Sequence, residues 1–409
     1  MAPLNATVRD PPAPLLRSSK KVPVLTNPEE LAVGMKLQQP VYAGSQLLLS
    51  AGKVLNAADI DFISQRAPRA TVYVVDPVFD ELISFHDDTR DRAVAHSTHR
   101  TLIRLMTDVE QRYASRAITN KIDCRGIQEA VAGAMTFLGQ HPVIAGELVE
   151  PVKDEEYLVS HAAHVFYLSL VLGDAVRVRV AEANKKHAAR YGSQQAIELD
   201  LTPLALAALF MDIGMWPMRY LYVQTEPLTM EQCEQLRNHP VESAAALPDD
   251  TPEITRLAIE THHENFDGSG YPYGLVGEEI HVFARILRIA DAYAAATTNH
   301  AFREACSPVR ALWEMTLGPF SQFYDPILLK IFYTLMQPFP IGAKVELNSG
   351  QHGVVVRYGR QSPFLPEIII AFDEAGRRLP AGEIVGPIRL DQHDTLGIVA
   401  FGGEDLRDI

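Results

Sequence analysis

Apolar residues recur at helical spacing through the middle of the chain. Between about residues 79 and 150 they are spaced as in Leu102, Leu105 and Val109, which is the period of a helix with one buried face. Proline and glycine then separate further helices, which the pattern predicts at residues 155–174, 201–213, 229–247, 252–263, 282–298, 307–316 and 325–336. The centre of the chain is therefore expected to be a helical domain.

Both ends of the chain show shorter apolar runs between glycines, a pattern typical of β-strands. Near the N-terminus the runs lie at residues 31–37, 46–49 and 71–75, and a segment at 56–66 that opens on Asn56 predicts one helix. Near the C-terminus the period falls toward two at residues 344–347, 353–357, 367–372 and 388–390. The C-terminal runs predict a small SH3-like β-barrel. The expected fold class is mainly α, with a helical domain flanked by small β-rich modules.

These patterns divide the 409 residues into five parts. One domain per roughly 100–200 residues is usual, so a single domain does not fill the chain. Residues 1–21 contain four prolines and a Ser-Ser-Lys-Lys run, which predicts a flexible arm. The other boundaries are expected at 22–78 for the N-terminal module, 79–150 for helices that join or brace the domains, 151–338 for the helical domain and 339–409 for the C-terminal module.

Composition limits the classes of partner. The formal net charge of -14 argues against a general nucleic-acid or anionic-membrane surface, because such surfaces need clustered lysine and arginine. The three cysteines are far apart without metal or redox spacing, so we interpret them as reduced thiols of a cytoplasmic protein. No apolar run approaches the roughly 18 residues that span a bilayer, and membrane insertion is not expected.

The strongest chemical signal is His262-His263-Glu264, followed by a Gly-rich stretch from Asp267 to Pro272. Imidazole is the commonest ligand for borderline transition metals, and carboxylate suits harder ions. Glycine allows the backbone to approach a bulky anionic ligand closely. The stretch therefore suits metal-assisted phosphate chemistry, although the two histidines could also form a polar helix end ahead of a turn.

The stretch from Thr261 to Glu304 resembles the signature of the HD-GYP family, bacterial phosphodiesterases that hydrolyse cyclic di-GMP. The matching positions, with spacing kept throughout, are His262-His263, Asp267, Gly270-Tyr271-Pro272, Gly274-Leu275, Gly277, Ile280, Ala284-Arg285-Ile286 and Ala290-Asp291. Upstream segments at His161, Phe210 and His239 resemble the family's first ligand helix, its His-Asp segment and its His-Pro segment. The resemblance covers about residues 151–338.

The resemblance implies a set of site residues. The family's metal ligands would fall on His161, Asp212, His239, His262, His263 and Asp291, with Asp212 also in the catalytic role of a ligand that bridges two cations. Substrate-binding positions would be Gly270, Tyr271, Pro272 and Arg303. The implied cofactor is one or two divalent metal ions, iron, manganese or a similar metal.

The apolar surroundings of two aspartates support their assignment as metal ligands. Asp212 follows an apolar run and Asp291 lies within an apolar helix, and a buried carboxylate is costly unless it is paired or bound to metal. Two alternatives stay open: Asp212 could accept hydrogen bonds from a helix start, and His239 could simply precede a Pro-initiated helix. His164 and His281 match no ligand position and are taken as ordinary polar neighbours.

The chain departs from the family pattern at four positions. Met211 stands where the family has histidine before aspartate, and Met215 stands where it has lysine. Thioether is a poor ligand for hard or borderline ions, and losing the lysine removes a cation that would meet a phosphate oxygen. His300 replaces an expected arginine, and Tyr157 replaces the glutamate of three-metal members, so a third metal is not expected.

Two functions remain in competition. The first is a metal-dependent phosphodiesterase that cleaves cyclic di-GMP to pGpG or GMP with weakened activity. The second is a catalytically inactive relative that binds cyclic di-GMP or a signalling partner such as a diguanylate cyclase. Six retained ligand positions favour the first, whereas Met211, Met215 and His300 favour the second. A purely structural helical scaffold would not explain two aspartates in apolar helices.

Overall fold

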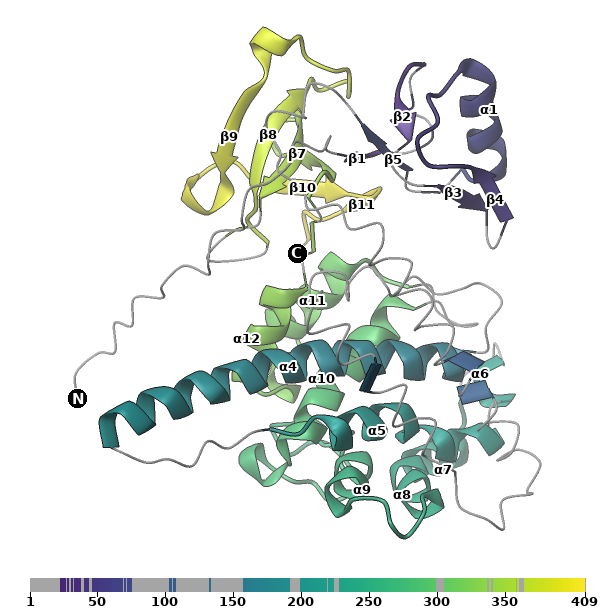
Figure 1. Cartoon of the computed structure of the whole chain (residues 1–409), viewed down its shortest axis with the longest axis vertical. Helices are drawn as coiled ribbons and strands as arrows, with labels where there is room; N and C mark the ends of the chain where they lie inside the picture. Colours follow the sequence, from purple (N-terminus) through teal and green to yellow (C-terminus); the bar gives the residue numbers. More distant parts are fainter. Residues whose placement is uncertain are drawn as a thin grey trace. The chain divides into compact units, whose positions relative to one another are not determined.

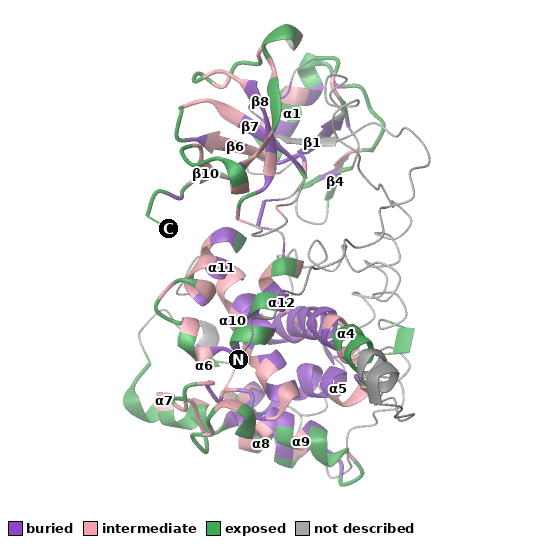
Figure 2. Cartoon of the chain, turned by 90° about the vertical axis from the view of Figure 1, so that its left-hand side faces the viewer, coloured by how far each residue is buried: buried purple, intermediate pink, exposed green. Residues whose placement is uncertain are grey.

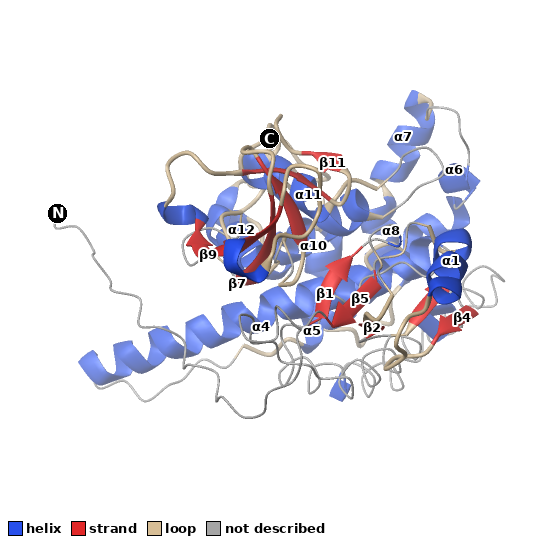
Figure 3. Cartoon of the chain, turned by 90° about the horizontal axis from the view of Figure 1, so that it is seen from above, coloured by secondary structure: helices blue, strands red, loops and turns tan. Residues whose placement is uncertain are grey.

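The computed structural model describes residues 23–75, 157–191, 199–223, 228–298 and 305–408, apart from short gaps inside these ranges, and a few positions between 103 and 133. The expected arm at 1–21, most of the region 79–150, His300 and Arg303 lie outside the described residues. The chain forms two compact units, of which the first ends near Asp87 and the second contains nearly all the rest. The strands in Figure 3 belong to the N-terminal unit and to the C-terminal module, and the elements described between them are helices.

The N-terminal unit is a small α/β module. An antiparallel sheet has the order β1-β5-β2, formed by β1 (Pro23–Thr26), β5 (Val72–Val75) and β2 (Lys36–Leu37), while β3 (Val41–Ala43) pairs with β4 (Gln46–Leu49). Helix α1 (Ala57–Arg66) begins at Asn56, whose side chain accepts from the Asp59 backbone while Asp59 accepts from the Asn56 backbone. This reciprocal cap satisfies two backbone donors that the first turn leaves open, as the Asn56 signal indicated.

The helical domain is built around one long helix, α4 (Tyr157–Tyr191) (Figure 1). The elements that follow are α5 (Thr202–Phe210), η3 (Ile213–Met218), α6 (Tyr220–Val223), α7 (Met230–Arg237), α8 (His239–Ala246), α9 (Glu253–Glu260), η4 (Gly277–Glu279), α10 (Val282–Thr297), α11 (Pro308–Thr316), η5 (Ser321–Phe323) and α12 (Pro326–Leu335). Helices α5, α10 and α12 pack against α4. Figure 2 shows buried residues along α4 and α5, where Phe166 and Phe210 are almost fully enclosed.

Part of α4 has the length and apolar composition of a membrane-spanning helix. The segment Tyr157–Ala183 meets both criteria, so the expectation that no such run exists was wrong. However, 83% of its most apolar window is buried inside the structure. Apolar side chains on all sides of a helix also suit the centre of a helical domain, where neighbouring helices cover every face.

One predicted helix is divided in two by a proline. The pattern at 229–247 predicted a continuous helix, but α7 ends at Arg237 and α8 begins at His239. Pro240 has no N–H to donate to the carbonyl four residues earlier, and its ring disfavours an uninterrupted helix. The break makes His239 the first residue of a new helix, with Pro240 directly after it.

The C-terminal module is an antiparallel sheet with the order β11-β10-β6-β7-β8-β9. Its strands are β6 (Lys344–Leu347), β7 (His352–Arg357), β8 (Glu367–Phe372), β9 (Val385–Arg389), β10 (Ile398–Phe401) and β11 (Glu404–Asp405). The pattern of apolar runs missed β10 and β11. Val309 of α11 joins the apolar cluster of this sheet, and Arg310 pairs with Glu404.

Candidate metal centre

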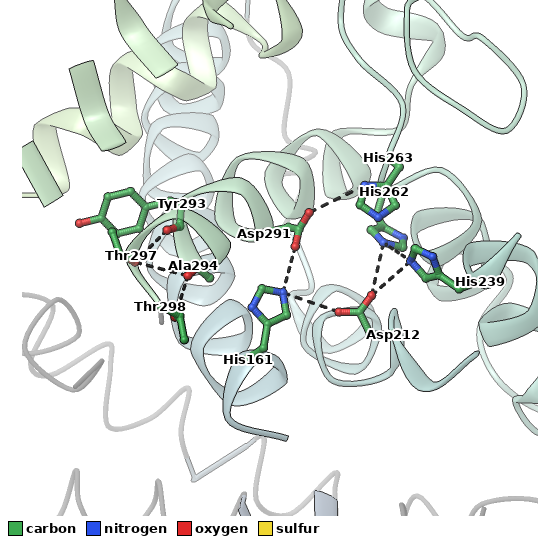
Figure 4. Close-up of polar contacts among 10 residues, drawn as sticks. All are labelled: His161, Asp212, His239, His262, His263, Asp291, Tyr293, Ala294, Thr297 and Thr298. Atoms are coloured by element: carbon green, nitrogen blue, oxygen red, sulfur yellow. Dashed lines mark hydrogen bonds and ion pairs between the residues drawn. The ribbon is translucent and has the colours of Figure 1, made fainter. Parts of the chain in front are cut away.

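Six side chains from separate parts of the helical domain meet at one place (Figure 4). They are His161 of α4, Asp212 in the turn after α5, His239 at the start of α8, His262 and His263 in the turn after α9, and Asp291 of α10. These are the six positions that the resemblance implied as metal ligands. They fall into two groups of potential ligand atoms, His239 with His262 and His263, and His161 with Asp212 and Asp291, each within 4.8 Å.

Asp212 lies between the two groups. Its Oδ1 is 3.3 Å from His239 Nε2 and 3.8 Å from His262 Nε2, whereas its Oδ2 is 3.7 Å from His161 Nε2. No backbone N–H among the described residues donates to this carboxylate. Asp212 therefore does not cap a helix there, and its two oxygens face histidines of different groups, as a bridging ligand would.

The carboxylate of Asp291 lies between His161 and His263. Its Oδ1 is 3.0 Å from His161 Nε2, and its Oδ2 is 3.8 Å from His263 Nδ1. The position on α10 places the carboxylate opposite α4, because these two helices pack together. Its side chain is only 12% exposed, so the histidines compensate the cost of burying the charge.

Backbone carbonyls orient two of the imidazoles. His239 Nδ1 donates to the carbonyl of Leu236 at 2.5 Å, and His262 Nδ1 donates to the carbonyl of Ile259 at 2.6 Å. The carbonyl of Leu236 has no helical donor, because Pro240, four residues later, has no N–H. Ile259 lies in the last turn of α9, where carbonyls lack helical partners. The proton of each ring is thereby held on Nδ1, which leaves Nε2 with a lone pair.

The two Nε2 atoms face each other at a distance of 3.3 Å. When both rings are neutral, two lone pairs face each other at this distance and repel. A cation between them and Asp212 would remove the repulsion. An imidazole that donates its other N–H to a backbone carbonyl is the usual arrangement of a metal-binding histidine. The donor set thus fits borderline divalent ions.

Electrostatics keep most of this cluster in the protonation states that metal ligands need. Burial and the neighbouring His239 lower the pKa of His262 to about 4. Burial and His262 lower the pKa of His263 well below its ordinary value. The pKa of Asp212 is lowered because its hydrogen bond to His239 and the histidine charges outweigh the effect of burial.

His161 differs from the other histidines. Burial alone would lower its pKa, but the hydrogen bond to Asp291 and the charges of Asp291 and Asp212 raise it. Its Nδ1 is buried and has no hydrogen-bond partner among the described residues. The ring stacks on Tyr157, with centroids 5.4 Å apart. An aromatic ring thus occupies the position where three-metal members have a carboxylate.

The Gly-rich loop is held by Glu264, whose carboxylate stands in the His262-His263-Glu264 motif but belongs to neither ligand group. This buried carboxylate accepts hydrogen bonds from the backbone N–H groups of Tyr273, Gly274 and Leu275 at 2.7 to 3.1 Å. A side chain at position 270 would not fit, because a Cβ there would lie 2.2 Å from the Asn265 nitrogen. The loop therefore folds tightly over the histidine pair.

Tyr271 is the loop residue that touches the cluster. Its ring stacks on His263 with centroids 4.8 Å apart. Gly270 and Pro272 flank it in the same turn, so the described part of the expected substrate-binding set lies beside His263. Arg303, the remaining member, lies outside the described residues.

A close backbone contact places Asp212 beside His239. Gly214 N–H donates to Ser243 Oγ at 2.9 Å, and a Cβ at Gly214 would lie 2.7 Å from the carbonyl oxygen of His239. Glycine therefore permits η3 to lie directly on the start of α8. Met211, one residue earlier, is completely buried in the apolar core.

The other histidines have ordinary structural surroundings. His281 caps α10 by accepting from Phe283 N–H at 3.2 Å. His164 is buried on α4, one turn beyond His161, and belongs to neither ligand group. The sequence pattern did not indicate Arg237, which lies over the Tyr271 ring, or Arg288, which contacts Asn265 of the same loop. The spacing of Arg288, one helical turn before Asp291, was the signal that could have found it.

Comparison with known proteins agrees with this geometry. Residues 167–328 match a family model described as an HD domain. A cyclic di-GMP phosphodiesterase of Pseudomonas aeruginosa is 28% identical over 195 residues, which are 47% of this chain and 46% of the relative. The phosphodiesterase PdeB of Borreliella burgdorferi is 30% identical over 146 residues, covering 35% and 38% of the two chains. The response regulator RpfG of Xanthomonas campestris is 35% identical over 88 residues, covering 21% and 23%.

The fold and the histidine–aspartate cluster define a helical domain of the HD class, whose phosphohydrolases depend on metal. The family match and these relatives support the HD-GYP type for this helical domain. The chain spans less than half the length of each of these three relatives.

Proposed function

We propose that this protein is a cyclic di-GMP signalling protein whose HD domain hydrolyses cyclic di-GMP to pGpG or GMP, with weakened activity. The relatives above are named cyclic di-GMP phosphodiesterases. The observation that carries the proposal is the pair of Nε2 atoms of His239 and His262, which face each other and Asp212 while both Nδ1 atoms donate to backbone carbonyls. Such a set of lone pairs suits a cation.

The six residues of the cluster would hold one or two divalent ions, such as iron or manganese. When bound, such ions polarise a phosphodiester and supply hydroxide at neutral pH. Asp212 contributes one carboxylate oxygen to each ligand group. Tyr271, held against His263 by the Gly-rich loop, shapes the side of the site that the substrate would enter.

The weakened activity is inferred from two methionines. Met211 is enclosed in the apolar core, so it offers no ligand in place of histidine. Met215 packs against the same core and brings no positive charge. Removing one donor to a developing oxyanion typically costs about a hundredfold or more in rate.

A second candidate is a protein that binds cyclic di-GMP, or a partner such as a diguanylate cyclase, without hydrolysis. The burial of Met211 favours it, because a lost ligand position could leave a single metal that acts only in binding. For either function we propose a cytoplasmic location. The two described cysteines, Cys233 and Cys306, are free thiols, as a reducing compartment would allow.

The test is to purify the protein without chelators and to measure bound metal and cyclic di-GMP hydrolysis together. We expect metal in the wild type and slow hydrolysis, and we expect Asp212→Asn to lose both, because one amide oxygen cannot replace a bridging carboxylate. Metal with binding but no turnover would favour the second candidate. A wild type without metal after supplementation with iron and manganese would refute the proposed enzyme.

A further inference from the structure

The metal cluster is most accessible at His263. Its side chain is 20% exposed, against 12% or less for the other five residues of the cluster. Tyr271 covers one face of this imidazole. A ligand that reaches the cluster from solvent therefore passes the pair formed by His263 and Tyr271.

Arg237 stands beside this entrance. It is the last residue of α7, two positions before His239, and its side chain is exposed. Its guanidinium carbon lies 5.8 Å from the centroid of the Tyr271 ring. No carboxylate among the described residues forms an ion pair with it, so its charge is available to an anionic ligand.

Arg288 of α10 reaches the Gly-rich loop that carries Tyr271, at Asn265. It lies one helical turn before Asp291, and residues three apart share a helix face. Its Nε donates to Asn265 Oδ1 at 2.9 Å, and its guanidinium carbon lies 5.3 Å from the Tyr324 ring centroid. These two contacts orient the guanidinium, while its terminal nitrogens have no hydrogen-bond partner among the described residues.

We propose that Arg237 and Arg288 together bind the phosphate groups of the ligand, and so replace the cation that is missing at Met215. A guanidinium presents two parallel N–H groups that match the oxygens of a phosphodiester, and an oriented guanidinium loses little freedom on binding. Two such groups, one over the Tyr271 ring and one at Asn265 of the same loop, suit a ligand with two phosphodiesters, as cyclic di-GMP has. For the identity of the ligand, this inference rests on the proposed function.

The experiment compares Arg237→Gln and Arg288→Gln with the wild type. Arg237→Lys and Arg288→Lys keep the charge but not the fork of donors. Arg179→Gln is the matched control, because Arg179 is an exposed residue of α4 that lies roughly 27 Å from His161 at a rise of about 1.5 Å per residue. Each protein is loaded with manganese, its metal content is measured, and the dissociation constants of cyclic di-GMP and of bis(para-nitrophenyl) phosphate are determined at low and high salt.

We expect each Gln variant to bind cyclic di-GMP about tenfold more weakly or worse, with unchanged metal content, because each loses a charge-assisted contact. The Lys variants should recover part of the affinity, and the Gln variants should show a weaker dependence on salt. Arg179→Gln should match the wild type. If Arg288→Gln does not fold, the comparison of Arg237→Gln with the wild type decides, because Arg237 is exposed.

The outcomes separate this inference from the proposed function. If the wild type binds cyclic di-GMP and both Gln variants bind it equally well, the phosphate-binding pair is refuted and the proposed function stands. The wild type could instead fail to bind cyclic di-GMP but bind bis(para-nitrophenyl) phosphate, with both arginines required. That result would support the phosphate-binding pair and refute cyclic di-GMP as the substrate. If the wild type binds neither probe, both are overturned.

Discussion

The Nε2 atoms of His239 and His262 lie 3.3 Å apart, although both rings use Nδ1 to donate to a backbone carbonyl. The carbonyls are those of Leu236 and Ile259, and each is left without a regular helical partner by the end of a helix or by the proline that follows. The interruption of α7 at Pro240 and the end of α9 thus set the tautomers of two imidazoles. For these two rings, helix ends determine which nitrogen faces the centre.

Restoring the two family residues should increase turnover. We expect Met211→His with Met215→Lys to raise cyclic di-GMP hydrolysis about a hundredfold or more, because the change returns a ligand and a cation at the phosphate. The measurement is turnover per folded, metal-loaded protein. Since Met211 is fully buried, the variant will also lose stability, so each single variant serves as a control for folding. Wild-type turnover already near 1 per second or faster would contradict the premise.

Removing the charge of Glu264 should loosen the Gly-rich loop. In Glu264→Gln, the bonds from the N–H groups of Tyr273, Gly274 and Leu275 lose their anionic acceptor. Leaving such buried groups poorly paired costs about 1–3 kcal/mol each at most. We expect a lower free energy of unfolding and faster proteolysis within residues 266–277. Glu278→Gln, an exposed change on η4, is the control. Equal cleavage rates in both variants would show that Glu264 does not hold the loop.

Adding a single methyl group at Gly270 should disturb the site. The Cβ of Gly270→Ala would lie 2.2 Å from the nitrogen of Asn265, so the backbone of the loop must move. We expect reduced metal content and a lower melting temperature, because the loop follows directly on His262 and His263. Gly382→Ala has no atom within 4 Å of the new methyl group and should behave as the wild type. Wild-type melting and metal content in Gly270→Ala would disprove the close approach.

Acid should destabilise the metal-free protein before its carboxylates titrate. His262 stays neutral in the folded state to about pH 4, because burial and His239 lower its pKa, whereas the unfolded imidazole binds a proton below about pH 6.5. The unfolded state therefore holds more protons in this window, and stability falls as the pH drops from 6.5 to 4. His263, whose pKa is also lowered, acts in the same direction.

For one such histidine, the free energy of unfolding is expected to fall by about 1.4 kcal/mol for each pH unit of acidification within this window. His161 has the opposite effect, because its pKa is raised in the folded protein. Its contribution to the free energy of unfolding is complete below pH 6.5 and is lost at higher pH. Urea denaturation of metal-free protein between pH 4.5 and 7.5 measures the sum. His262→Asn should flatten the acid side of the curve. A stability that rises on acidification would show that His262 is charged in the folded protein.

The local pattern of the chain was sufficient for most of the helical domain. Helical spacing located α5, α9, α10, α11 and α12, because an amphipathic helix repeats its buried face within a few residues. Asn56 correctly marked the start of α1. The same reasoning failed at α7 and α8, where a proline outweighed a continuous pattern. It also failed at two short strands that depend on their neighbours, β10, which pairs with β6, and β11, which pairs with β10.

By itself the sequence determined which residues were candidates for the site, because the spacing of the motif around His262 and Asp291 resembles that of one family. Only the tertiary structure decided how these residues meet. Asp212 faces histidines of both groups because Gly214 lets η3 approach α8, and Arg288 of α10 reaches Asn265 at the start of the Gly-rich loop. The physical reason is that periodicity records contacts within one element, whereas distances between elements depend on packing between residues far apart in the chain.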